Sequence, residues 1–211
     1  MPGTDAHWDS VYRSKDAARV SWYQAEPQPS LDALDRFGAR SDQSFIDIGG
    51  GASSLVDSLV GRGWTDLAVL DLARSALDVA RERNGDASCK VDWICADVTD
   101  WRPARQWDVW HDRAVFHFLT GVEQRRAYKQ ALATGLSEDG LLLIATFALD
   151  GPDKCSGLPV QRYDAPGLQV ELGAGLELLD TWREVHTTPW GSKQNFTWCA
   201  FRKRSQLAQD D

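Results

Sequence analysis

A short apolar segment ends in an acidic residue and runs directly into a glycine cluster, in Asp47-Ile48-Gly49-Gly50-Gly51-Ala52-Ser53. A glycine turn lets a ligand approach the backbone closely, because no Cβ blocks the approach. The helix expected after the turn offers unpaired N–H groups and the positive end of its dipole. This combination is typical of a site for a nucleotide-type cofactor.

Further charged and polar side chains stand where later strands are expected to end. Asp71 closes a second apolar run, Asp97 follows a third, and His111-Asp112-Arg113 closes a fourth. Ligands of doubly wound sheets bind above the carboxyl ends of the strands, near the switch in strand order. We therefore expect Asp47, Asp71 and Asp97 to line one cavity together with the glycine turn.

Alternating strands and helices must hold these residues in place. The apolar segments predict strands over residues 45–48, 67–71, 91–95, 107–111 and 140–147. Helical spacing predicts helices over residues 53–62, 74–83 and 123–135, the first of them with Ser53 as its N-cap. The alternation predicts an α/β fold, with a doubly wound and mostly parallel sheet that carries helices on both faces.

The end of the chain has a different pattern. Residues 176–186 and 194–202 flank a turn-rich segment, 187–192, with no helix between them. A terminal antiparallel hairpin is the simplest interpretation, and it brings the sheet to seven strands. We expect a single domain over residues 1–204, in which residues 1–40 form a helical lid segment, and a polar tail over residues 205–211.

Composition limits the classes of partner. The chain has 211 residues, 43% hydrophobic and 26% charged, which suits an ordinary globular α/β domain. Its net charge of −8 without a basic stripe argues against a nucleic acid or an anionic membrane surface as partner. The N-terminus lacks the pattern of a signal peptide, and the longest apolar run is far too short to span a bilayer. The default expectation is the cytoplasm.

The cysteines and acidic residues do not suggest a metal site. Cys89, Cys95, Cys155 and Cys199 include no pair with CxxC spacing, so neither a zinc site nor a redox dithiol is indicated. Cys95 and Cys199 lie in apolar runs and are expected to be buried free thiols. No cluster of oxygen ligands is visible, so we expect no metal.

The acids, the glycine turn and the hairpin together resemble the class I S-adenosylmethionine-dependent methyltransferases, over roughly residues 8–202. The first motif of this family has an acid two residues before its first glycine and then glycines at alternate positions. Asp47, Gly49 and Gly51 match it, and Ser53 replaces the third glycine. The resemblance implies a Rossmann-like seven-stranded methyltransferase fold, with S-adenosyl-L-methionine as cofactor and S-adenosyl-L-homocysteine as product.

The resemblance also implies roles for individual residues. Asp71 matches the acid that accepts hydrogen bonds from the ribose hydroxyls, and Asp97 the acid that receives the adenine amino group; a helix cap and a turn residue are the alternatives. Asp47 falls near the methionine end, where it favours positive charge, and His111 near the sulfonium. The implied cofactor contacts also include Gly50, Leu72 and Val98.

Aromatic residues near the N-terminus extend the resemblance. Trp8, Tyr12 and Trp22 are similar to a lid segment of a subgroup that includes small bacterial enzymes and some protein-lysine methyltransferases. In that subgroup such residues cover the cofactor and shape the acceptor pocket. The alternative is that they attach an amphipathic N-terminal helix to the sheet.

The segment after the fourth strand is where the family places acceptor chemistry. Asp112, Arg113 and His117 are the candidate catalytic residues. His117 could take a proton from an amine or thiol, since its unperturbed pKa lies near neutrality, although a structural histidine is an equal alternative. Arg113 could pair with an acidic substrate, but an ion pair with Asp112 is favoured. The loop over residues 151–163 is expected to shape the acceptor site, with Cys155 as a less favoured ligand for a soft acceptor.

The favoured function is methyl transfer by in-line displacement to an N, S or O atom of a small molecule, with protein lysine as the alternative acceptor. The protein then has to align the nucleophile and exclude water. Two other functions stay open. A nicotinamide-dependent dehydrogenase would need a third glycine where Ser54 stands. A cofactor-binding regulator would keep the site without turnover.

Overall fold

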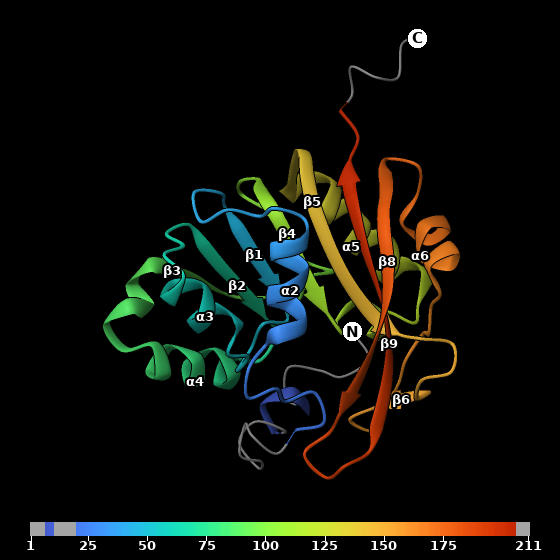
Figure 1. Cartoon of the computed structure of the whole chain (residues 1–211), viewed down its shortest axis with the longest axis horizontal. Coiled ribbons are helices and arrows are strands. Elements are labelled where there is room, and N and C mark those ends of the chain that lie inside the picture. The colour runs from blue at the N-terminus through green and yellow to red at the C-terminus, as the bar shows by residue number, and fades with distance from the viewer. Residues whose placement is uncertain (1–6, 11–19, 206–211) are drawn as a thin grey trace.

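A seven-stranded sheet forms the centre of the molecule (Figure 1). The computed structural model describes residues 7–10 and 20–205. The strand order of the sheet is β3-β2-β1-β4-β5-β9-β8. The parallel strands are β1 (Phe45–Ile48), β2 (Leu67–Asp71), β3 (Val91–Cys95), β4 (Trp107–Arg113) and β5 (Leu136–Phe147). β9 (Lys193–Lys203) runs antiparallel between β5 and β8 (Leu176–Thr187), so the predicted mostly parallel sheet with a terminal hairpin is confirmed.

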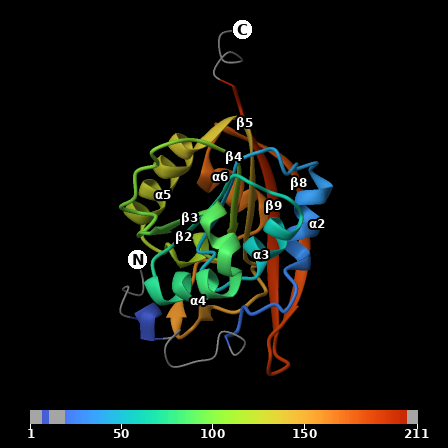
Figure 2. The ribbon, with the colours of Figure 1, turned by 90° about the vertical axis from the view of Figure 1, so that its left-hand side faces the viewer.

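Helices cover both faces of this sheet (Figures 1 and 2). One face carries α2 (Gln28–Arg36), α3 (Leu55–Gly61) and α4 (Arg74–Asn84), and the other carries α5 (Val122–Gly135) and α6 (Ala165–Leu172). Short 3₁₀ turns are η2 (Gly85–Lys90) and η3 (Phe116–Phe118), and β6 (Lys154–Cys155) pairs with β7 (Leu158–Pro159) outside the main sheet. The helices of the two faces bury two separate apolar clusters against the sheet.

The period of two along β4 decides which side chains face the functional site. Val109 belongs to the cluster under α2, α3 and α4, whereas Trp110 belongs to the cluster under α5 and α6. Successive residues of a strand point to opposite faces. His111 and Arg113 therefore share the face of Val109, and Asp112 points to the opposite face.

The first helix differs slightly from the prediction. α3 begins at Leu55, with Ser54 rather than Ser53 at its N-cap, so the predicted cap is wrong by one residue. The hydroxyl of Ser53 still accepts the backbone N–H of Leu55 at 3.1 Å. Neither α2 nor α6 was placed individually from the sequence.

Cys95 departs from its expected burial. Cys155 and Cys199 are buried, but Cys95 is exposed, because it ends the edge strand β3, which no strand covers on its outer side. All three are free thiols. Within residues 7–10 and 20–205, no helix combines the length and apolar character needed to cross a membrane.

Candidate active site

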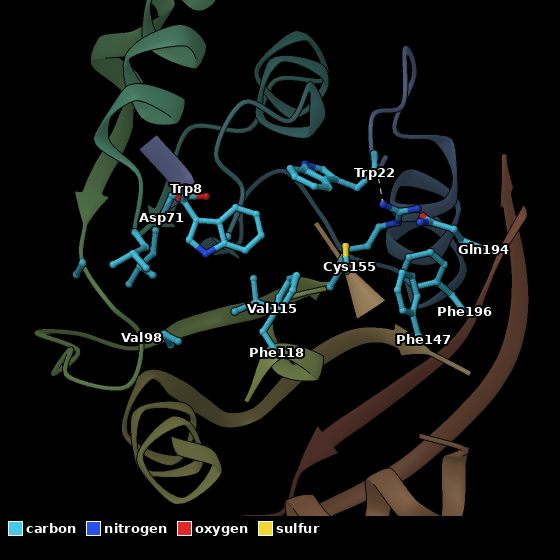
Figure 3. Close-up of a pocket in the computed structure, with 16 residues that line it drawn as sticks. Trp8, Trp22, Asp71, Val98, Val115, Phe118, Phe147, Cys155, Gln194 and Phe196 are labelled. Carbon is cyan, nitrogen blue, oxygen red and sulfur yellow. Dashed lines mark hydrogen bonds between the residues drawn. The ribbon is translucent and has the colours of Figure 1, made fainter. Parts of the chain in front are cut away.

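Two adjoining cavities lie along the carboxyl ends of the parallel strands, and they share Trp22, Gly49 and Arg113. The first cavity extends from Asp71, at the end of β2, to Phe147, at the end of β5 (Figure 3). The second lies beside the glycine turn and the start of α2. The sheet edge predicted from the sequence is therefore hollowed on both sides of the turn after β1.

The glycine turn brings bare backbone to the cavity wall. Gly49 has a φ of +70°, and a Cβ at this position would lie 2.0 Å from Cγ2 of Val115. A Cβ on Gly50 would lie 2.6 Å from Oδ2 of Asp47. Both glycines line a cavity, and Gly51 next to them is buried with a φ of +40°. Only glycine combines this conformation with so close an approach.

Asp71 presents a buried carboxyl group at the end of β2. Its Oδ1 accepts the backbone N–H of Ala73 at 2.7 Å, and the residue is 8% exposed. Burial, with a smaller contribution from the nearby carboxylate of Asp47, raises the pKa of Asp71 to about 7, although the backbone hydrogen bonds that it accepts act in the opposite direction. Leu72 and Val98 line the same cavity. A polar ligand that donates to Asp71 would favour its ionised form.

Asp47 belongs to a buried chain of hydrogen bonds. Its Oδ1 lies 2.7 Å from Nδ1 of His111, and Nε2 of His111 lies 3.0 Å from the hydroxyl of Ser30 on α2. All three residues line the second cavity. Ser30 was missed from the sequence, because nothing in the pattern of α2 distinguishes it from its neighbours. The chain fixes the orientation of the Asp47 carboxylate.

Asp97 takes part in a turn at the end of β3. Its Oδ1 accepts the backbone N–H and the hydroxyl of Thr99, at 2.8 and 2.7 Å. Asp97 does not itself line either cavity, although Ala96 and Val98 line the first. The turn accounts for both contacts, and the adenine contact of Asp97 stays a prediction.

Both predicted lid tryptophans, Trp8 and Trp22, line the first cavity. The ring of Trp8 packs edge to face on Trp22 and Phe118, with centroids 5.7 and 5.2 Å apart (Figure 3). Oδ1 of Asp9 accepts both the backbone N–H and the hydroxyl of Ser75, at the start of α4. Residues 7–10 are thus fastened beside the end of β2. Tyr12 lies outside the described residues.

Asp112 has a structural position, in contrast to its predicted catalytic one. Its carboxylate accepts the backbone N–H groups of Val115 and Phe116 and, at 2.7 Å, the hydroxyl of Tyr128 on α5. It is fully buried and lines neither cavity. Burial raises the pKa of Asp112 to about 6. The alternation of β4 sends this side chain to the wrong face for acceptor chemistry.

Arg113 pairs with Glu184 of β8, so the favoured pairing with Asp112 is wrong. Nη2 of Arg113 lies 2.8 Å from Oε1 of Glu184, and Nε1 of Trp198 donates to Oε2 at 2.6 Å. The guanidinium carbon lies 4.6 Å from the ring centroid of Phe196. Both charged side chains are about nine-tenths buried. Nothing in the sequence points to Glu184 beyond the alternation expected of the hairpin.

His117 does not reach either cavity. It is fully buried in η3, and its Nδ1 accepts the backbone N–H of Phe147 at 3.3 Å. Burial lowers the pKa of His117 to about 3, with a smaller contribution from the charge of Arg113. This burial and this hydrogen bond favour the structural alternative for His117 over its predicted role as a base.

Cys155 brings the loop after β5 into the site. It lines the first cavity, and its Sγ lies 3.9 Å from the hydroxyl of Ser21. Burial raises the pKa of Cys155 to about 11, so the thiol stays protonated at neutral pH. Arg162 anchors the same loop by donating to the carbonyl oxygen of Gly151. Cys155 therefore forms part of the wall of the first cavity.

A family model described as "Methyltransferase domain" matches residues 45–140. Malonyl-acyl-carrier-protein O-methyltransferase of Anoxybacillus flavithermus is 26% identical over 162 residues, and the match covers 72% of this chain and 58% of that protein. The chain thus spans less than two thirds of the length of this curated relative. Residues 45–140, which the family model matches, contain the glycine turn and the ends of the first four strands.

Solved structures share the fold over nearly the whole chain. One, described for the conversion of a disulfide bond into a thioacetal group during echinomycin biosynthesis, has a TM-score of 0.76 and 22% identity, and covers 95% of this chain and 93% of that one. The N-methyltransferase NodS of Bradyrhizobium japonicum, in complex with S-adenosyl-L-homocysteine, has a TM-score of 0.69 and 16% identity, over 93% and 100% of the two chains. These likenesses establish the architecture around the two cavities.

Proposed function

We propose that this chain is a class I S-adenosylmethionine-dependent methyltransferase, as the matching family model, the curated relative and the shared fold support, and that it transfers a methyl group to a small-molecule acceptor. The observation that carries the proposal is the pair of joined cavities at the switch between β1 and β4. There the glycine turn borders both cavities, with the carboxylate of Asp71 in the first and that of Asp47 in the second. Ligands of such sheets bind at this position.

The residues present fit S-adenosyl-L-methionine. Asp71 offers a buried carboxylate for ribose hydroxyls, and Gly49 presents backbone without a side chain at the cavity wall, where a Cβ would collide with Val115. Asp47, held by His111, gives a negative group for the methionine end. We assign Leu72, Val98 and Asp97 to the adenosine end. When bound, this cofactor supplies an electrophilic methyl group and leaves as S-adenosyl-L-homocysteine.

The chain itself contributes alignment and the exclusion of water. Trp8 and Trp22 cover the strand ends, and we propose that the segment they belong to acts as the lid. Phe147 and Phe196 form the wall on the β5 and β9 side. Holding a nucleophile in line within a dry cavity accelerates displacement without a dedicated acid or base.

A small molecule is favoured over a protein lysine as acceptor, because the cavity is enclosed by aromatic side chains from several elements. The net charge of −8 is unfavourable for a nucleic-acid substrate. We propose the cytoplasm as the compartment, which the free thiols of Cys95, Cys155 and Cys199 support.

Calorimetry tests this function against its alternatives. We expect saturable binding of S-adenosyl-L-homocysteine and none of NAD, because Ser54 stands where a dehydrogenase turn needs its third glycine. Binding of NAD alone would reject the proposal. A screen with tritiated methyl donor then separates small-molecule acceptors from a labelled protein band. Cofactor binding without any labelled product would favour a regulator instead.

A further inference from the structure

The part of the first cavity that the proposed cofactor residues do not line is here called the aromatic chamber. It is defined by Trp22, Arg113, Phe147, Cys155, Gln194 and Phe196. Phe147 and Phe196 pack edge to face, with ring centroids 4.8 Å apart. Figure 3 shows the ring of Trp22 across the space from this pair, with Cys155 between them. Aromatic walls of this kind favour a planar ring as ligand.

Gln194 supplies a polar group without a partner among the residues that the structure describes. The residue is 8% exposed, and its Oε1 is buried and accepts no hydrogen bond from any of them. Its position on β9 makes it part of the chamber wall. Buried amide oxygens in folded proteins are nearly always satisfied. An N–H donor on a bound molecule would satisfy this one.

The chamber favours an uncharged ligand. The cation of Arg113 is already neutralised by Glu184, which also accepts from Gln24 at 3.2 Å. The thiol of Cys155 stays protonated at neutral pH. An ammonium or carboxylate ligand would lose its hydration here without gaining a free counter-charge from the described wall residues.

The wall also limits the nucleophile. Among its described residues, the ionisable groups are the paired Arg113 and the protonated Cys155, and His117 is sealed off behind Phe147. None of these groups can deprotonate an acceptor. The reacting atom must therefore bring a lone pair that is available without loss of a proton, as in the ring nitrogen of a neutral azole.

We propose that the aromatic chamber takes a neutral, planar heteroaromatic acceptor whose ring N–H donates to Oε1 of Gln194. This inference rests on the proposed function. The second ring nitrogen forms the new N–C bond with its lone pair, while the C–S bond breaks and its electron pair stays on sulfur. The methylated ring then carries the positive charge and releases its N–H proton to water. The hydrogen bond to Gln194 strengthens as this charge develops, because the N–H becomes more acidic.

Binding to the wild-type protein tests the proposal first. The protein is saturated with S-adenosyl-L-homocysteine and titrated by calorimetry with benzimidazole, which carries both nitrogens, and with 1-methylbenzimidazole, which lacks the N–H. We expect benzimidazole to bind about five- to tenfold more tightly, the effect of one hydrogen bond to an otherwise unsatisfied group. Benzoate and cyclohexylamine serve as anionic and cationic probes and are expected to bind more weakly than benzimidazole.

A matched pair of variants assigns this preference to Gln194. Gln194→Leu should bring benzimidazole down to the affinity of its methylated analogue and leave that analogue unchanged. Gln169→Leu, an identical change at an exposed position of α6, should alter neither. Both variants should bind S-adenosyl-L-homocysteine as the wild type does, which also confirms that they fold.

The outcomes distinguish a failure of the proposed function from a failure of this inference alone. If S-adenosyl-L-homocysteine does not bind to the wild type, the proposed function fails and this inference fails with it. If it binds, the inference alone is overturned by equal affinity for the two benzimidazoles, by no binding of either, by tighter binding of benzoate or cyclohexylamine, or by an unchanged preference in Gln194→Leu.

Discussion

Asp47 and His111 are direct partners across the β1–β4 ladder, and Oδ1 of one lies 2.7 Å from Nδ1 of the other. Parallel neighbours in register place their side chains on the same face of the sheet. The same face carries Arg113, two residues further along β4. The polar groups around the glycine turn thus come from alternate positions of two adjacent strands, and Ser30 closes the arrangement from α2.

The contact between Gly49 and Val115 makes the turn sensitive to a single methyl group. Gly49→Ala should lower both the stability and the affinity for S-adenosyl-L-homocysteine, because its Cβ meets Cγ2 of Val115. Gly38→Ala is the control, since Gly38 has a similar φ of +67° but no atom near a new Cβ. It should cost only the strain of the left-handed backbone, about 1–2 kcal/mol.

Urea unfolding and calorimetry measure both effects at Gly49. The clash should add about 1–3 kcal/mol to the loss of stability seen at Gly38. The double variant Gly49→Ala, Val115→Ala should recover that part, because it removes the methyl group that is struck. Equal losses in Gly49→Ala and Gly38→Ala would show that backbone strain alone is at work.

The affinity for S-adenosyl-L-homocysteine should depend on pH through Asp71. Its pKa of about 7 in the free protein means that acid solution leaves it protonated. Ribose hydroxyls donate to the carboxylate, so the complex holds fewer protons than the free protein. Affinity should therefore rise by up to about tenfold per pH unit below pH 7 and level off above it.

Titrations between pH 5.5 and 8.5 test this dependence. Asp71→Asn should flatten the profile, and it should weaken binding at pH 8 by about 1.5–3 kcal/mol, the range for a hydrogen bond to a charged group. Binding enthalpies in buffers that differ in ionisation enthalpy report the released proton. The same slope in Asp71→Asn would assign the titration to another group.

Tyr128→Phe should destabilise the protein without changing cofactor affinity. The hydroxyl donates to Asp112 at 2.7 Å and accepts from Nε1 of Trp110 at 3.1 Å, all within the buried layer under α5. Loss of these bonds should cost about 1–3 kcal/mol in urea unfolding. A large change in S-adenosyl-L-homocysteine affinity would show that Asp112 contributes to the active site.

Glu184→Ala should destabilise by about 3–5 kcal/mol, because it leaves the buried cation of Arg113 without its partner. The double variant Arg113→Met, Glu184→Met should recover much of the loss, since well-packed apolar side chains replace a buried ion pair at little cost. Unfolding curves of the three proteins provide the comparison. Similar losses in the single and the double variants would mean that the pair itself is strongly stabilising.

Local patterns were sufficient to predict the sheet and the position of the glycine turn and Asp71 at its carboxyl edge. The glycine turn and Asp71 lie within consecutive strand–turn–helix units, where each residue's place follows from its own segment. The alternation of β4 also explains the position of Asp112. Val109 and Trp110 lie on opposite faces, so neighbouring polar residues of the strand do too. His111 and Arg113 line the second cavity, and Asp112 between them therefore faces away from it.

The contacts of Glu184 and His117 depend on pairings between distant segments, which no local pattern contains. Glu184 reaches Arg113 only because β9 inserts between β5 and β8. The burial of His117 follows from the packing of η3 against the end of β5, as its bond to the backbone of Phe147 shows. Register between distant strands and the burial of a short turn are properties of the assembled sheet.

The insertion of β9 has a consequence for how the protein is made and how it diversifies. The turn after β1 and the end of β2 leave the ribosome early, whereas Glu184 and Gln194 emerge late, and Glu184 then accepts a hydrogen bond from Gln24 near the opposite terminus. The glycine turn and Asp71 are therefore synthesised before the strand that completes the wall of the aromatic chamber. Substitutions confined to the final hairpin should alter that chamber and leave the glycine turn and Asp71 unchanged.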